Sequence, residues 1–268
     1  MVQKKISNFD IRQIHTSGQC FRMEEIGEGE FRILAGSRYL KIRQREENCE
    51  FFCSREEFEV FWSNYFDLEG DYAGCIASID PEDTYLTGAA RMGSGIRILR
   101  QDLWEMIVTF LISQQNHIAR IRRCVENICR RYGREMEAEG LRYYAFPTPE
   151  ALAGATEQEL RDCNLGYRSR YVLQTARSVA AKEVDLELVA RMDYPAARRE
   201  LLRLYGVGEK VADCICLFGM HCLEAFPVDT HIRQALKKHY PVGFPMERYM
   251  GCQGVIQQYI FYRELMGQ

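Results

Sequence analysis

The sequence predicts an α+β protein in which a small antiparallel β domain, residues 1–95, precedes a mainly helical domain, residues 96–268. Three observations predict this class. Residues 20–53 hold short stretches of aromatic and β-branched residues separated by glycine turns, which is typical of strands. Beyond residue 95, apolar residues recur at helical spacing almost to the end of the chain. Between the two parts, residues 91–95 (Arg-Met-Gly-Ser-Gly) have the composition of a linker.

The first domain is expected to contain strands and two helix starts. Ser54 and Glu57 have the spacing of a capping box and predict a helix that runs through Tyr65. Asp80 followed by Pro81 predicts another helix, with Asp80 as its N-cap and the proline at its first position. Strands are expected at residues 31–34, 39–43 and 50–53.

The second domain is expected to be almost entirely helical. Two apolar stripes at helical spacing come first, at residues 103–111 and 118–128. Later helices are expected at residues 157–163, 168–182, 194–203, 208–218, 229–239 and 246–265.

Composition bounds the function classes. The chain has 47% hydrophobic and 27% charged residues, which is ordinary for a soluble globular protein. It has neither a run of about 20 apolar residues that could span a membrane nor the apolar core of a signal peptide. We therefore expect an intracellular, soluble monomer without a membrane partner, cytoplasmic if the organism is prokaryotic.

Cysteine usage points to a reducing compartment. The eleven cysteines are odd in number and irregularly spaced, so we expect buried thiols rather than a disulfide framework. Neither Cys49 with Cys53 nor Cys214 with Cys216 has the Cys-x-x-Cys spacing of a zinc site.

Charge is unevenly distributed along the chain. The net charge of −3 argues weakly against a nucleic-acid partner. However, residues 1–95 carry 11 Lys and Arg against 17 Asp and Glu, whereas the remainder carries 24 against 21. The helical domain is thus the cationic one, with a modest excess.

A glycine hairpin within residues 201–218 is the most informative segment. Gly206 and Gly208 permit a tight turn, and the N–H groups there, at the start of a helix, can bind a phosphate. A plain turn between two helices is the alternative. Lys210 follows in the first helical turn, where the helix dipole disfavours an ammonium and favours the neutral, nucleophilic amine. A surface lysine that contacts phosphate is the alternative.

Asp229 lies nineteen residues after Lys210, at another expected helix start. Its carboxylate can be a simple N-cap, and it can also stabilise a developing positive charge or transfer protons. His231 either donates to a phosphate or lies on the helix surface.

At these residues the chain resembles the helix-hairpin-helix DNA glycosylase (HhH-GPD) superfamily. A hairpin lysine paired with a downstream aspartate is similar to its bifunctional members, which remove a base and then nick the strand. Further segments resemble the 8-oxoguanine DNA glycosylase family, and matching segments run from about residue 9 to residue 263. These segments are Gly-Gln-Cys-Phe-Arg at 18–22 and residues 95–102, 113–120 and 165–172.

The resemblance implies base excision repair of duplex DNA containing 8-oxoguanine. Lys210 would attack C1′, form a Schiff base and cleave the strand by β-elimination, while Asp229 stabilises the charged transition state. The extruded base would be recognised by a pocket in which the Gly18 carbonyl accepts from its N7–H. The other pocket residues would be Cys214 and Phe261, which sandwich the base, and Gln257, which binds its Watson–Crick edge.

The resemblance also assigns residues to the surrounding duplex. Tyr167 would wedge beside the orphaned partner base, and Arg120 and Arg168 would hydrogen-bond that base, for which the family expects cytosine; ordinary phosphate contact is the alternative for both arginines. Gln115 stands where eukaryotic members carry Asn, so a strict preference for cytosine does not follow. Further DNA contacts would come from Asn116, Gly206, Gly208 and His231.

No cofactor is expected in catalysis. Only Cys252 lies beyond Asp229, so the four clustered cysteines of an iron–sulfur cluster are lacking. By resemblance, the carbonyls of Leu202, Leu204 and Val207 would hold a structural monovalent or alkaline-earth ion. Three alternatives stay open: an oxidised-pyrimidine glycosylase/lyase, a non-catalytic helix-hairpin-helix DNA-binding module, and a helical protein in which the hairpin is only a turn.

Overall fold

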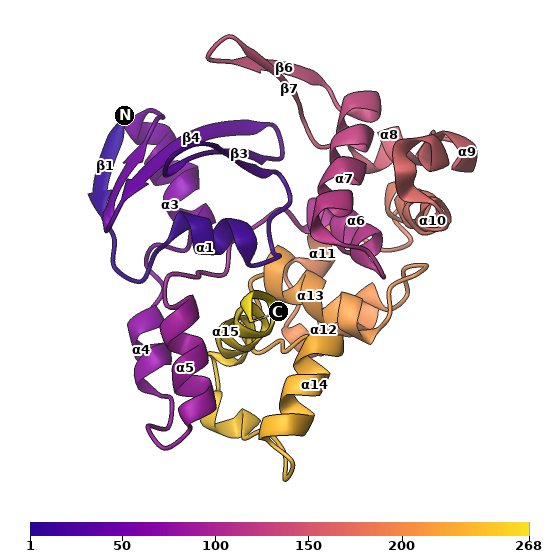
Figure 1. Cartoon of the computed structure of the whole chain (residues 1–268). Helices are drawn as coiled ribbons and strands as arrows, with labels where there is room; N and C mark the ends of the chain where they lie inside the picture. Colours follow the sequence, from indigo (N-terminus) through magenta and orange to yellow (C-terminus); the bar gives the residue numbers. More distant parts are fainter. Residues whose placement is uncertain (268) are drawn as a thin grey trace.

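The N-terminal part of the protein is a five-stranded antiparallel sheet with strand order β1-β5-β4-β3-β2 (Figure 1). This is a computed structural model, which describes residues 1–267. Two edge strands, β1 and β2, were not predicted, because their sequences, Val-Gln-Lys-Lys and Met-Glu-Glu-Ile-Gly, carry little apolar alternation. The strands span Val2–Lys5 (β1), Met23–Gly27 (β2), Glu30–Ala35 (β3), Arg38–Arg45 (β4) and Asn48–Phe51 (β5).

Alternation of side chains builds the core of the sheet. Phe31 lies opposite Ile42, and Ile33 opposite Leu40, and all four side chains are fully buried on one face. Helices α1 (Ile11–Thr16) and α3 (Ser63–Tyr65) and the helical turn Phe58–Trp62 contribute to this core, whereas α2 (Arg55–Glu57), which precedes that turn, buries no side chain. The predicted α+β class is confirmed.

Two helix starts differ from the prediction. Ser54 caps α2 through the N–H of Glu57, but the Glu57 carboxylate binds the indole N–H of Trp62, so the reciprocal capping box is absent. Asp80 does not start a helix. Instead, α5 begins at Thr84 with Asp83 as its N-cap, because residues 81–82 form a turn.

The expected linker is also displaced. Helix α5 (Thr84–Gly93) takes up three of its five residues, and an extended segment at residues 94–102 makes the connection instead. That segment is firmly held, since the buried Arg97 guanidinium donates to the carbonyls of Ser7, Asn8 and Asp67.

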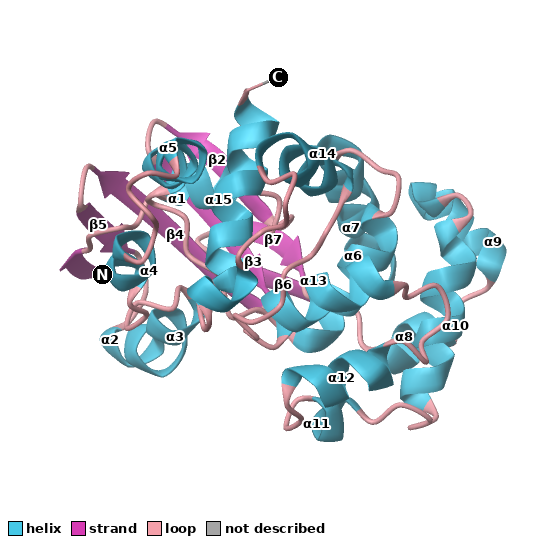
Figure 2. Ribbon diagram, turned by 90° about the horizontal axis from the view of Figure 1, so that it is seen from below, coloured by secondary structure: helices cyan, strands magenta, loops and turns pink. Residues whose placement is uncertain are grey.

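The rest of the chain is mainly helical (Figure 2), and its last helix, α15, packs against α4, α5 and α14. Helices α4 (Tyr72–Ala77) and α5, although they precede the connection, share the helical core and pack near α15. A β hairpin, β6 (Glu135–Ala138) and β7 (Leu141–Tyr144), was not predicted in this part. The helices are α6 (Leu103–Ser113), α7 (Ile118–Tyr132), α8 (Pro149–Ala153), α9 (Glu157–Leu160), α10 (Arg168–Ala180), α11 (Leu186–Val189), α12 (Tyr194–Leu201), α13 (Glu209–Gly219), α14 (Thr230–His239) and α15 (Gln253–Met266), with single turns at Arg161–Leu165 and Met246–Tyr249.

Nine cysteines are free thiols, as predicted, and seven of them are buried while Cys53 and Cys222 are partly exposed; the prediction is wrong for one pair. Cys75 in α4 and Cys252 before α15 form a disulfide although they are 177 positions apart in the sequence, so spacing gave no signal for it. Within residues 1–267, no helix has both the length and the apolar character needed to cross a membrane.

Candidate active site

Gly206 and Gly208 have different structural roles in the hairpin. Gly206 has a φ of +89°, and a Cβ there would lie 2.5 Å from Cγ of Tyr171, so the turn requires glycine. Gly208 has an ordinary φ of −96° and caps α13, and a Cβ there would meet nothing within 4 Å. The prediction of a tight turn therefore holds for Gly206, whereas Gly208 leaves the backbone at the start of α13 accessible.

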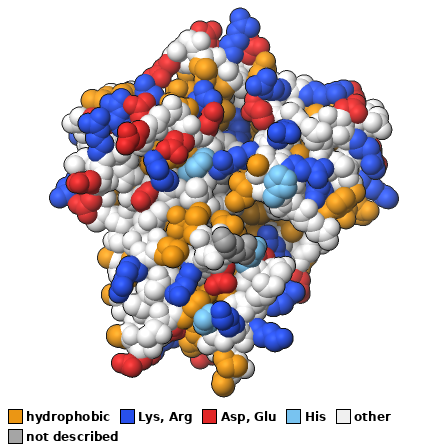
Figure 3. Space-filling view, viewed as in Figure 1, with side chains coloured by type: hydrophobic (Ala, Val, Ile, Leu, Met, Phe, Trp, Pro, Cys, Tyr) orange, Lys and Arg blue, Asp and Glu red, His pale blue; other side chains and the backbone are white. Residues whose placement is uncertain are grey.

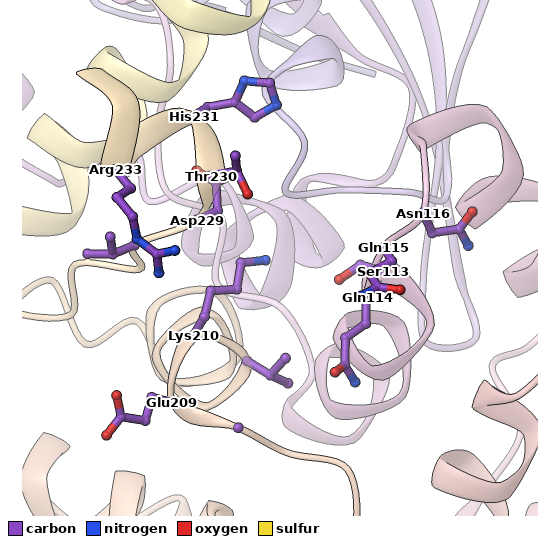
Figure 4. A pocket seen from close by; sticks show the side chains of 13 residues that line it. Ser113, Gln114, Gln115, Asn116, Glu209, Lys210, Asp229, Thr230, His231 and Arg233 are labelled. Carbon is purple, nitrogen blue, oxygen red and sulfur yellow. The ribbon is translucent and has the colours of Figure 1, made fainter. Parts of the chain in front are cut away.

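Lys210 and Asp229 face one cleft, as predicted. Figure 4 shows the Lys210 side chain pointing into the space between the Asp229–His231 segment and residues 113–116. The cleft has a volume of about 580 Å³. Its lining consists of residues 113–116, 208–211 and 228–231 together with Arg233.

The lining of the cleft is mainly polar, but an aromatic pair lies beside the Lys210 amine. Its Nζ lies 5.6 Å from the ring centroid of Phe110, which stacks on Phe218. Cys214 follows one turn later on α13 and is buried. Burial raises the pKa of the Cys214 thiol, against the opposing effect of Lys210, so this thiol stays neutral beside the amine.

Asp229 is an N-cap, and it also faces the cleft. Its Oδ1 accepts from the N–H of Ile232 at 2.8 Å, which starts α14. The cap uses one of two carboxylate oxygens and fixes the side chain at the cleft wall. Both interpretations of Asp229, cap and candidate catalytic group, are thus compatible with one geometry.

Of the four predicted base-pocket residues, the structure brings Gly18 and Phe261 into contact. Gly18, with a φ of +76°, lies against Phe261, since a Cβ at Gly18 would be 3.2 Å from Cε1 of that ring. Gln257 is buried and donates to the Pro227 carbonyl at 3.0 Å, two residues before Asp229. None of the four, including Cys214, lines the cleft itself. Phe261 therefore occupies the approach to Gly18.

The loop that carries Gly18 is rigidly held by its neighbour Gln19, which sequence reasoning missed. The fully buried Gln19 amide donates to Ser17 Oγ and the Arg97 carbonyl and accepts from the N–H of Leu99, each at 2.9 Å. A polar side chain with all its partners inside the fold fixes local backbone geometry. Its only sequence signal was its place in the segment at 18–22.

The predicted DNA-facing residues divide into exposed and buried groups. Tyr167 is 43% exposed, and its hydroxyl donates to the Gln114 carbonyl, which places it beside the segment that lines the cleft; its role as a wedge stays a prediction. Arg168 is 3% exposed and donates to the carbonyls of Gln114 and Gln115. Arg168 therefore supports the turn at residues 114–115 from behind, and contact with a partner base requires it to leave these carbonyls.

Arg120 lies in a smaller cavity of about 210 Å³ beside the cleft, which is also lined by His117, Arg123 and Asn164. Gln114 was not predicted, yet its amide donates to the Gly206 carbonyl at 3.1 Å and joins the 113–116 segment to the hairpin.

Figure 3 shows Lys and Arg side chains over the helical half of the face, whereas acidic and basic side chains mix over the sheet. This agrees with the excess of basic residues beyond residue 95.

Ion binding at the hairpin stays a prediction. The Leu204 carbonyl accepts from the N–H of Val207 at 3.1 Å, which closes the turn whose carbonyls, with that of Leu202, would face an ion. Among residues 1–267, no three His, Cys, Asp or Glu side chains lie together as metal ligands.

Comparison with known proteins agrees with this geometry. Residues 1–107 match the N-terminal domain of 8-oxoguanine DNA glycosylase, and residues 108–248 match the HhH-GPD superfamily of base excision DNA repair proteins. A probable N-glycosylase/DNA lyase of Methanothermobacter thermautotrophicus is 32% identical over 236 residues, 77% of this chain and 73% of that protein. An N-glycosylase/DNA lyase of Saccharomyces cerevisiae is 36% identical over 161 residues, 56% of this chain and 43% of the yeast protein.

A solved structure covers nearly the whole chain. The 8-oxoguanine glycosylase/lyase of Clostridium acetobutylicum, in complex with double-stranded DNA containing cytosine opposite 8-oxoguanine, is 33% identical. Its TM-score is 0.89, over 97% of this chain and 96% of that chain. The fold and the hairpin cleft define a helix-hairpin-helix base excision repair protein. Within that class, the chain belongs to the 8-oxoguanine DNA glycosylase family, which confirms the resemblance and, at the level of the family, the expectation of an enzyme.

Proposed function

We propose that the protein excises 8-oxoguanine from duplex DNA and then cleaves the abasic strand by β-elimination. The observation that carries this is the placement of Lys210 and Asp229 at two helix starts on one cleft, beside the exposed wedge Tyr167. A non-catalytic binding module has no use for an amine and a fixed carboxylate that line the same cleft. The DNA complex of the Clostridium relative supports the substrate class.

The proposed chemistry begins at the sugar. The neutral Lys210 amine attacks C1′ of the extruded nucleotide, the bond from C1′ to the base breaks, and the base leaves with the electron pair and takes up a proton. Asp229 stabilises the positive charge that develops on the sugar. The bond from C1′ to the ring oxygen then opens, the oxygen stays on C4′ as a hydroxyl with the proton given up by the nitrogen, and C1′ and Lys210 form a Schiff base.

Strand cleavage then follows from the Schiff base. A base removes a proton from C2′, the bond from C3′ to its oxygen breaks, and the strand 3′ to the lesion leaves as a phosphate ester. Water hydrolyses the imine and frees Lys210. Every step uses groups that line the cleft and needs no cofactor, so the ion predicted at the carbonyls of Leu202, Leu204 and Val207 would serve only to hold a phosphate.

Base selection is proposed to depend on Gly18. In 8-oxoguanine N7 carries a proton, whereas in guanine it carries a lone pair, so a fixed carbonyl attracts the lesion and repels guanine. The bonds of Gln19 hold the Gly18 backbone in place for this purpose. The lesion can enter only if the Phe261 ring moves from Gly18, after which ring and base can stack with Cys214 on the other side.

Partner-base choice is proposed to depend on the two arginines and on Gln115. Arg120 is poised at its cavity, whereas Arg168 acts on a base only after releasing the carbonyls of Gln114 and Gln115. Gln115 itself has a φ of +48° and lines the cleft. Asn116, Gly206, Gly208 and His231 would contact the backbone, and the enzyme would act as an intracellular monomer.

A substrate panel tests the proposal. Borohydride reduces a Schiff base to a stable link, so wild-type protein should be trapped on duplexes with 8-oxoguanine opposite each of the four bases. Lys210→Gln should give no adduct, whereas the exposed control Lys237→Gln should match wild type. Trapping on thymine glycol in preference to 8-oxoguanine would favour the pyrimidine enzyme, and DNA affinity without any adduct would favour the binding module.

A further inference from the structure

A contact between Arg122 and His15 ties the lesion pocket to the helix that faces the partner strand. Building on the proposed function, we propose that Arg122 is a positioning residue that sets the preference for 8-oxoguanine over guanine by fixing the Gly18 loop against α7. It touches neither the cleft nor its predicted catalytic groups.

The geometry of the contact is specific. One terminal nitrogen of Arg122, Nη2, donates to the His15 carbonyl at 3.0 Å. The two terminal nitrogens also lie 3.3 Å from the two ring nitrogens of His15. A neutral imidazole has one acceptor nitrogen, so at most one of these ring contacts is a hydrogen bond. The carbonyl bond is therefore the directional one, and the guanidinium also covers the ring.

His15 is suited to receive a guanidinium. Burial, together with Arg122 and Arg12, lowers its pKa to about 4, so the ring is neutral at physiological pH and does not repel Arg122. The ring also packs on Phe31 of the sheet core, at a centroid distance of 5.4 Å. Arg122 thus holds a residue that is itself anchored to the N-terminal sheet.

The contact reaches Gly18 through a short, rigid stretch of chain. His15 lies at the end of α1, and Ser17 follows with its hydroxyl bonded to the Ile14 carbonyl at 2.8 Å and to Gln19 at 2.9 Å. Gly18 stands between these two anchored residues. A displacement at His15 therefore moves the Gly18 carbonyl, the group that must meet N7–H of the lesion.

The same helix faces the partner strand on its other side. Arg122 follows Arg120 by two positions on α7, which places the two side chains roughly 200° apart around the helix axis. Arg120 points to the cavity beside Asn164, while Arg122 points to α1. A change in how α7 sits on DNA is therefore transmitted to the Gly18 loop.

The test combines selectivity with a measurement that needs no substrate. Arg122→Met keeps the stem and removes the donors, Arg122→Lys restores one donor, and Arg130→Met is the matched control, 66% exposed on the same helix. Loss of a charged hydrogen bond is expected to lower the ratio of single-turnover rates on 8-oxoguanine and guanine about tenfold in Arg122→Met, with partial recovery in Arg122→Lys. Hydrogen exchange of residues 14–20, followed by mass spectrometry, should be faster in Arg122→Met than in Arg130→Met.

The outcomes separate this inference from the proposed function. An unchanged selectivity ratio, or exchange equal to that of Arg130→Met, would overturn the role of Arg122 while wild-type excision of 8-oxoguanine stands. A wild-type protein that does not excise 8-oxoguanine would overturn the proposed function and, with it, the selectivity role. A fall in rate on both bases with an unchanged ratio would show a merely structural contact and also overturn the inference.

Discussion

The residues proposed for catalysis, Lys210 and Asp229, and those proposed for base recognition, Gly18 and Phe261, are positioned by different kinds of structure. Lys210 and Asp229 each stand at the start of a helix, where local sequence places them on an open cleft. Gly18 and Phe261 come from opposite ends of the chain, and in the fold they close against each other behind that cleft. Under the proposed function, chemistry would depend on local structure that is already exposed, whereas selection of the base would depend on long-range packing that must open.

This difference predicts separable effects on rate and on selectivity. The largest should come from Asp229→Asn. Asparagine caps a helix about as well as aspartate, so folding should be unaffected, while loss of the charge should lower the single-turnover rate by about 10²- to 10³-fold. Asp193→Asn, at the N-cap of α12 outside the cleft, is the control and should keep wild-type activity. A variant with normal rate would reduce Asp229 to a cap.

The next effect concerns the stability of the hairpin. Gly206→Ala places a Cβ against Tyr171 at a positive φ and should cost about 3 kcal/mol of unfolding free energy. Gly208→Ala meets no atom within 4 Å and should cost less than about 1 kcal/mol. Urea denaturation of both variants compares these costs, and equal losses would mean that the turn is not held by Tyr171.

The next prediction concerns Asp67, whose buried carboxylate should make the stability of the fold sensitive to acid. Asp67 is buried, which alone would raise its pKa, but hydrogen bonds from His221, Tyr72 and Arg100 lower this pKa to about 2. Because the folded pKa is depressed, the stabilisation is present above the ordinary value near 3.8 and is lost as pH falls through 2.

The Asp67 effect can be measured directly. Asp67→Asn should lose about 2 kcal/mol at neutral pH, and its difference from wild type should shrink between pH 4 and pH 2. Denaturant unfolding at several pH values measures it. A difference that is independent of pH would mean that packing around residue 67, and not its charge, provides the stabilisation.

The smallest expected effect is that of Phe261→Ala, which should change the selectivity for the base more than the rate of strand cleavage. Phe261→Ala removes the ring that a base must displace and then stack upon, which should weaken discrimination between 8-oxoguanine and guanine about tenfold. The rate of cleavage at a preformed abasic site should stay close to wild type, because Lys210 and Asp229 are untouched. An equal loss of rate on 8-oxoguanine duplexes and on preformed abasic sites would contradict the separation of chemistry from recognition.

Sequence patterns predicted the catalytic side better than the recognition side. The glycines, Lys210 and Asp229 lie within short segments whose helix starts can be predicted from local residue preferences. The support of Gly18 by Gln19 and Arg97 joins residues about 80 positions apart, and no periodic pattern reports such contacts. The inward turn of Arg168 follows from packing against residues 114–115 and was likewise not predictable.

The fold shows the same limit. Strands β3, β4 and β5 and the long helices were predicted from apolar periodicity, whereas the edge strands and the β6–β7 hairpin carry polar sequences and were missed. Asp80 failed as a helix start because its carboxylate accepts from the N–H of Glu82 in a turn, and Asp83 caps the helix instead.

The central claim is that Lys210 is the nucleophile. Protein trapped by borohydride on an 8-oxoguanine duplex can be digested and the modified peptide sequenced by mass spectrometry. The sugar remnant is expected on Lys210 alone, within the peptide that follows Arg203. A remnant on another lysine or on the N-terminal amine, or release of 8-oxoguanine without any adduct, would contradict it.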